Sequence, residues 1–181
     1  MSRLAPIALA LVALLAAPAL AQQLPGSRAE LEAYASLDAR KYATARRQAE
    51  EILAEGPSLI ATFVLGSVHY RGEGNHPRGL FLVREAKRML TARFGEPPTE
   101  AAWQLWHKRI MLEEQWLLGE MDRREEQLAA LDEHDRFYKP PMDVRRIWPL
   151  LKLGRFEEAR AIGNEYIHDP NEWTRERAYN G

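Results

Sequence analysis

Two histidines, His69 and His76, flank a glycine-rich stretch in the first half of the chain, and Glu73 lies within that stretch. Histidine nitrogens and carboxylate oxygens bind zinc, which needs a third or fourth ligand held in fixed geometry. The HExxH spacing is absent, and no second cluster of histidines lies nearby in the sequence. We therefore expect an ordinary turn between helices here, with no metal site and no cofactor.

Adjacent carboxylates are the second group that could do chemistry. Glu113 and Glu114 stand side by side, and a mixed charge run follows at 123–126. Paired carboxylates can perform general acid–base catalysis, but nothing in the sequence places these beside a nucleophile. The chain also has no cysteine, which excludes thiolate catalysis. We expect these charges to lie on solvated helix faces, and we expect no enzyme activity.

Tryptophans are the third group. Trp103, Trp106 and Trp116 share one apolar stretch, and Trp148 follows later. Tryptophan at helical spacing usually packs in a core, but it is also enriched at binding hot spots. Both roles stay open from the sequence.

The elements that must position these residues are all predicted to be helical, because no stretch alternates apolar and polar residues as a strand would. Ser27 and Glu30 form a capping-box pattern at the start of the first helix. Thr99 is expected to cap the fifth helix, and Gly119 to provide the turn after it. The expected helices span 29–38, 41–55, 58–71, 78–94, 99–118, 122–138, 142–153 and 155–168.

A short sequence pattern recurs along the chain, in which an aromatic residue lies three positions before an alanine. Tyr42 precedes Ala45, and Phe156 precedes Ala159. Gly79 follows Ala45 by 34 residues, and Leu65-Gly66 lies between them. This pattern resembles the tetratricopeptide repeat (TPR), a helix–turn–helix unit of about 34 residues. In that family small residues let the paired helices approach closely, and Ala45, Gly66, Gly79 and Ala159 match those positions. The match covers roughly residues 29–170, with departures at Arg40 and Arg124 and a longer third unit.

The resemblance implies an all-α fold, a right-handed superhelical array (an α-solenoid) of about four degenerate antiparallel helix pairs. It also implies a concave face that binds a protein or peptide partner. Counting from the repeat landmarks predicts these partner-binding residues: Tyr34, Tyr70, Arg71, Arg109, Glu113, Trp116, Trp148 and Lys152. The lysine–asparagine set that clamps peptide carboxylates in chaperone-binding members is absent at these positions.

The first 21 residues have the pattern of a secretory signal peptide. A short basic start precedes an apolar run, and Ala19-Leu20-Ala21 offers a small-x-small cleavage site. We expect cleavage between Ala21 and Gln22, a linker over 22–28, and export to the periplasm or beyond. An uncleaved membrane anchor is the alternative. Residues 171–181 read as the start of a further helix or a truncated repeat.

Charge is balanced along the chain, with 25 basic and 26 acidic residues. This balance argues against a nucleic-acid partner, which would favour a basic face. The sequence therefore favours an exported, non-catalytic scaffold or adaptor in the cell envelope. The alternatives are the repeat portion of a larger protein that carries an effector or enzyme domain, and a small periplasmic enzyme.

Overall fold

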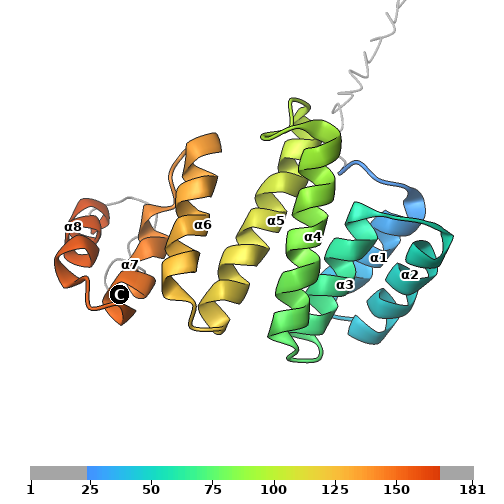
Figure 1. Cartoon of the computed structure of the whole chain (residues 1–181), viewed down its shortest axis with the longest axis horizontal. Coiled ribbons are helices and arrows are strands. Elements are labelled where there is room, and N and C mark those ends of the chain that lie inside the picture. Colours follow the sequence, from blue (N-terminus) through green and yellow to red (C-terminus); the bar gives the residue numbers. More distant parts are fainter. Residues whose placement is uncertain (1–23, 168–181) are drawn as a thin grey trace, which may run out of the picture.

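The computed structural model describes residues 24–167. The predicted leader, its cleavage position at Ala21 and Gln22, and the segment 171–181 lie outside this part. Within it the chain forms eight α-helices and one short 3-10 helix, so the predicted all-α class is confirmed. The helices stand side by side in a row (Figure 1). They are α1 (Arg28–Asp38), α2 (Tyr42–Glu55), α3 (Leu59–Arg71), α4 (His76–Phe94), α5 (Ala101–Glu120), α6 (Arg124–Phe137), η1 (Asp143–Arg146), α7 (Ile147–Lys152) and α8 (Phe156–Tyr166).

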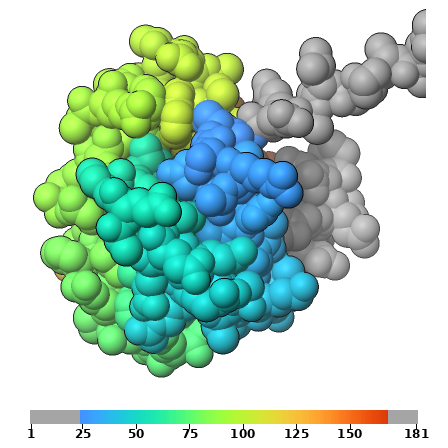
Figure 2. Space-filling view, turned by 90° about the vertical axis from the view of Figure 1, so that its right-hand side faces the viewer, coloured from blue at the N-terminus to red at the C-terminus, as the bar shows by residue number. Residues whose placement is uncertain are grey.

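Each helix packs against the next from α1 to α8, and taken two at a time in chain order they give the pairs α1–α2, α3–α4, α5–α6 and α7–α8. Figure 2 looks onto the end of the row, where α1 and α2 lie in the middle of the view and α4 is visible at the left. The capping box that begins α1 is present: the Ser27 N–H donates to Glu30 at 2.7 Å, and the Glu30 N–H donates to the Ser27 hydroxyl at 3.3 Å. Two donors at the helix start are thereby satisfied, as the sequence predicted.

Three of the four pairs are joined by the same turn. Arg40, Asp122 and Gly154 each have a left-handed backbone, with φ of 56°, 58° and 72°. In each turn the next N–H donates to a carbonyl five residues back, at 2.9 Å: Lys41 to Ser36, Arg123 to Leu118 and Arg155 to Leu150. This bond satisfies a carbonyl at the helix end that would otherwise lack a partner. The α3–α4 turn is longer, and Gly74 takes the left-handed position there, at φ 67°.

Several expected boundaries were wrong; α4, for example, begins at His76 rather than at Arg78. Gly119 is helical and buried inside α5, and Asp122 makes the turn instead. The fifth helix begins after Glu100 rather than Thr99, without a side-chain cap. The seventh helix is a 3-10 turn followed by a short α-helix, and Pro149 lies in the first turn of that α-helix. Proline is accepted there because the first N–H groups of a helix have no internal partner.

The α3–α4 contact is a close crossing of two glycines. A Cβ added to Gly66 would lie 3.0 Å from the Leu82 Cβ and 3.1 Å from the Val83 backbone nitrogen. A Cβ added to Gly79 would lie 2.9 Å from the Tyr70 Cβ and 3.0 Å from the Gly66 carbonyl oxygen. The two helices therefore approach so closely that neither position has room for a side chain. This confirms the expectation that small residues lie where paired helices cross.

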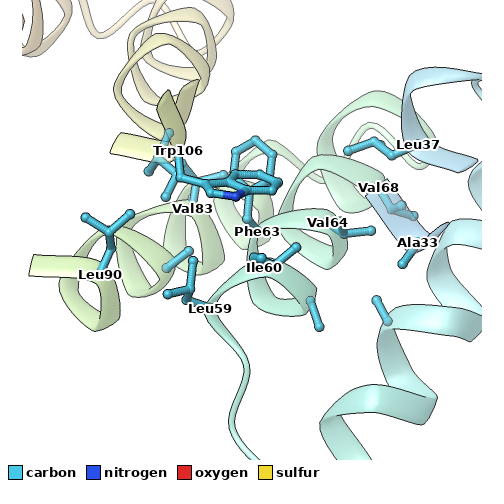
Figure 3. Packing of buried hydrophobic residues seen from close by; sticks show 14 of the residues in the cluster. Ala33, Leu37, Leu59, Ile60, Phe63, Val64, Val68, Val83, Leu90 and Trp106 are labelled. Atoms are coloured by element: carbon cyan, nitrogen blue, oxygen red, sulfur yellow. The ribbon is translucent and has the colours of Figure 1, made fainter. Parts of the chain in front are cut away.

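The main apolar core lies among α1 to α5. Trp106 is fully buried at its centre, with edge-to-face contacts to Tyr34 at 5.0 Å and Phe63 at 5.7 Å between ring centroids. Its indole N–H donates to the Pro25 carbonyl at 2.9 Å, so the segment expected to be a linker is held against this core. Figure 3 shows Trp106 beside Phe63, with Val83 and Leu90 nearby. Trp106 thus has the core role that the sequence left open.

A second, smaller core lies at the other end of the row. Its buried members are Leu128, Val144, Ile147, Leu150 and Ala159. Between residues 24 and 167, no helix is both long enough and apolar enough to cross a bilayer.

Candidate functional site

The eight predicted partner-binding residues all lie on the first helix of a pair. Tyr34 is on α1; Tyr70 and Arg71 are on α3; Arg109, Glu113 and Trp116 are on α5; Trp148 and Lys152 are on α7. α1 packs against α3, and α3 contacts α5, although each neighbouring pair is separated in sequence by a second helix. Side chains of α1, α3 and α5 can therefore meet, although these helices are not consecutive in the chain.

Five of the eight residues line one cavity of about 220 Å³, here named the Arg109 hollow: Tyr34, Arg71, Arg109, Glu113 and Trp116. Leu37, Asp38, Phe63 and Leu112 complete its wall. Two arginines, two carboxylates and aromatic rings from three helices meet there. The hollow therefore offers both apolar surface and charged groups that can bind an anion.

Arg71 and Glu113 form a two-pronged ion pair across α3 and α5. The Arg71 Nε donates to Glu113 at 2.9 Å, and an Arg71 terminal nitrogen donates to the second carboxylate oxygen. The Glu113 side chain is only 5% exposed. Burial disfavours the charge on Arg71, but the bond to Glu113 outweighs it and raises the Arg71 pKa. The expectation of a solvated Glu113 was wrong, because α3 covers this face of α5.

Arg109 is held differently, by rings more than by carboxylates. Its guanidinium lies 4.7 Å from the Tyr34 ring centroid, in cation–π contact. The nearest carboxylate oxygen, on Asp38, is 4.0 Å from Nη1, and Nη1 is buried without a hydrogen-bond partner. Burial lowers the Arg109 pKa, with Glu113 opposing that effect. A cation with an unused donor is the group in the hollow most able to bind an added acceptor.

The other three predicted residues lie elsewhere. Tyr70 packs at the α3–α4 crossing, its ring 5.4 Å from that of His76, and burial raises its pKa. Trp148 is 51% exposed and lines a second cavity, between α5, α6 and α7, that it shares with Trp116. Lys152 is exposed, with Nζ 4.6 Å from the Trp148 ring centroid. Trp116 therefore stands between the Arg109 hollow and the second cavity.

Sequence reasoning missed the role of Glu114. Its side chain is 6% exposed and accepts from Arg84 at 2.7 Å and from Lys87 at 2.9 Å. Lys87 also donates to Glu133 on α6 at 2.7 Å, so one network joins α4, α5 and α6. Successive helical residues point about 100° apart, so Glu113 and Glu114 enter different interfaces. Arg84 and Lys87, three positions apart on one face of α4, were the available signal.

The residues considered for metal binding make other contacts. The His69 Nδ1 lies 2.7 Å from a Glu73 oxygen, and Arg46 donates to the other Glu73 oxygen at 2.6 Å. Over residues 24–167, no group of three histidine or acidic side chains is arranged to hold a metal ion.

The chain was compared with known protein families, curated proteins and solved structures. No family model, no curated protein and no solved structure matches the chain.

Proposed function

We propose that this chain is an exported, non-catalytic TPR-like protein that binds a protein or peptide partner in the cell envelope. In this proposal its four helix pairs form a right-handed superhelical array, and the first helices of the pairs form the binding face. The observation that carries the proposal is the Arg109 hollow, where residues from α1, α3 and α5 meet. The repeated turn at Arg40, Asp122 and Gly154 supports a repeating architecture.

The chemistry of the hollow suits an extended segment with an acidic side chain. Tyr34 and Trp116 offer aromatic surface, and Trp116 is 42% exposed. Arg109 supplies the unused donor at Nη1, whereas Arg71 is already bonded to Glu113. Arginine and aromatic residues dominate binding energy at such surfaces because they combine apolar contact with directional hydrogen bonds.

The two arginines are not equivalent probes. Arg71→Glu would place a second carboxylate against buried Glu113 and would destabilise the fold. Arg109→Glu removes the unused donor and the long ion pair with Asp38, whose side chain is 57% exposed and can be solvated, so it is the cleaner test. Peptides selected from a display library on the wild-type protein provide the ligand, and calorimetry gives the Kd. We expect Arg109→Glu to weaken binding by at least about tenfold, while circular dichroism stays helical.

The matched control is Arg88→Glu on α4, whose side chain is 67% exposed and pairs only with Glu85 among the described residues. It should leave the Kd unchanged. Equal loss in both variants would assign binding to overall charge rather than to the hollow. Failure of a large library to give any binder would contradict the proposal.

The export part of the proposal has its own test. Sequencing of the protein recovered from the envelope fraction should begin at Gln22. Retention of Met1 in a membrane-embedded protein would replace export with anchoring.

A further inference from the structure

A second cavity, here named the tryptophan cleft, lies where α5, α6 and the η1–α7 segment meet. It has a volume of about 450 Å³, within the range of small-molecule sites. Trp116 and Trp148 contribute rings that are 42% and 51% exposed. Two buried amides, Gln115 and Gln127, also line it. The cleft thus combines flat apolar surface with polar groups that are shielded from bulk water.

The two amides lie in a row between fixed hydrogen-bond donors. On one side of Gln115 are the indole N–H of Trp116 and Nη1 of Arg145, at 3.2 and 3.1 Å from the nearer amide atom. On the far side of Gln127, Arg124 Nη1 donates to the Gln127 oxygen at 3.1 Å. The facing amide atoms of Gln115 and Gln127 are 3.3 Å apart. Each end of the row therefore requires an amide oxygen.

No orientation of the two amides satisfies this row. With both oxygens turned toward the outer donors, the two NH₂ groups face each other in the middle, 3.3 Å apart. With either amide reversed, its NH₂ group faces an outer donor instead. Because buried amide donors are costly without acceptors, the row needs an added acceptor oxygen.

Gly119 provides the space for this arrangement. A Cβ at this position would lie 2.8 Å from Nε2 of Gln127 and 3.2 Å from its Cδ and Oε1. The glycine is helical and serves no turn, contrary to the sequence expectation. Its missing side chain leaves the Gln127 amide beside Gln115 at the cleft wall.

We propose that the tryptophan cleft binds a small planar organic acid. Its carboxylate oxygens accept from the Gln115 and Gln127 amides, and its flat body lies against Trp116 and Trp148. A carboxylate suits this position because its two oxygens can accept from the two facing NH₂ groups at once. This inference does not rest on partner binding at the Arg109 hollow. Ligand binding at the cleft and partner binding at the hollow can each be contradicted without affecting the other.

The test uses 2-naphthoate as the probe and calorimetry on the full chain expressed without its predicted leader. Two analogues separate the contributions: 2-naphthamide keeps the ring and removes the charge, and acetate keeps the carboxylate and removes the ring. We expect saturable 1:1 binding of 2-naphthoate, with both analogues weaker by about tenfold or more. Binding of 2-naphthamide as tight as 2-naphthoate, or no binding of 2-naphthoate, would overturn the proposal.

Three variants locate the binding. Gln127→Leu removes an amide, Gly119→Ala displaces it, and Trp148→Ala removes an exposed ring that the fold does not need. Each should weaken 2-naphthoate by about tenfold. Gln48→Leu on α2 is the amide control and should have no effect. Arg109→Glu should also leave 2-naphthoate binding intact, which distinguishes the cleft from the hollow.

A last experiment distinguishes a small organic acid from the C-terminal carboxylate of a polypeptide. The peptide Gly-Gly-Gly-Phe with a free carboxylate presents the same chemistry as part of a polypeptide. We expect it to bind at least about tenfold more weakly than 2-naphthoate, because its flexible backbone must be ordered. Tighter binding of the peptide would overturn the assignment to a small organic acid.

Discussion

The two ends of the helix row are held together in different ways. The N-terminal region, α1 to α5, is built on a continuous apolar core around Trp106 and Phe63. The C-terminal region, α6 to α8, has a small apolar cluster around Leu150, and it meets α5 through polar contacts as well as through Ala130, which packs in the main core. At this α5–α6 interface, His107 and the Tyr138 hydroxyl are 2.7 Å apart and buried, and the Gln115–Gln127 row lies further along.

This difference matters because the two kinds of packing respond to different changes. Apolar contacts depend on volume and are insensitive to protonation, whereas buried polar groups depend on every partner being present and correctly charged. The Arg109 hollow lies at the edge of the main apolar core, because Leu37 and Phe63 of that core help to line it. The tryptophan cleft lies beside the polar contacts between α5 and α6.

Trp106→Ala should produce the largest loss of stability. The ring is fully buried and loses both aromatic contacts and its bond to Pro25, so we expect about 3–5 kcal/mol from urea unfolding. Leu150→Ala, in the small C-terminal cluster, should cost about 2 kcal/mol. Equal losses would show that the two regions share one core.

Gly66→Leu should produce the next largest loss of stability, about 3 kcal/mol in the free energy of unfolding. The new side chain would meet the Val83 backbone, so α3 would have to move away from α4. The measurement is again urea unfolding. Gly56→Ala is the control: its Cβ meets nothing within 4 Å, and the change in stability should stay within about 0.5 kcal/mol. An unchanged midpoint for Gly66→Leu would contradict the close crossing.

Acid should act on the α5–α6 interface and spare the apolar core. Burial and the nearby Lys87 charge lower the pKa of His107 from 6.5 to about 4. The unfolded chain therefore binds a proton more readily than the folded one. Stability is full above pH 6.5 and is lost as pH falls toward 4, by about 2 kcal/mol between pH 7 and pH 5.

Urea unfolding at the two pH values measures this loss. The carboxylates with lowered pKa values, Glu73, Glu126, Asp135 and Glu158, contribute below this window, because their ordinary values are 4.5 or less. In His107→Gln the pH dependence between 7 and 5 should largely disappear. Its persistence would assign the effect to another group.

Glu114→Gln should have the smallest effect of the series. The change weakens bonds to Arg84 and Lys87, and Arg84 is 39% exposed, so solvent replaces part of the interaction. We expect a loss of about 1–2 kcal/mol in the free energy of unfolding. Glu50→Gln, at an exposed pair on α2, should be neutral. A neutral Glu114→Gln would show that these bonds add nothing to the packing of α4 against α5.

Helix content, most helix bounds and the first capping box could be predicted from the sequence, because they depend on residues within one or two turns of each other. The same holds for the small residues at Gly66 and Gly79, whose spacing marks a close crossing. Turn assignment was less certain, because Arg40 and Asp122 adopt left-handed backbones that a glycine would mark more clearly. Five of the eight residues that the repeat count predicted line one hollow, and their role in binding a partner stays a prediction.

The sequence by itself determined which residues form helices and which helix faces are apolar. Only the tertiary structure decided which charges are buried and which polar groups lack partners. Glu113 and Glu114 are identical neighbours in sequence, yet Glu113 pairs with Arg71 on α3 and Glu114 pairs with Arg84 and Lys87 on α4. Gly119 resembles a turn residue in sequence, yet it makes room for an amide from another helix. The physical reason is that burial and hydrogen-bond balance depend on the side chains that other helices contribute, and no local pattern records them.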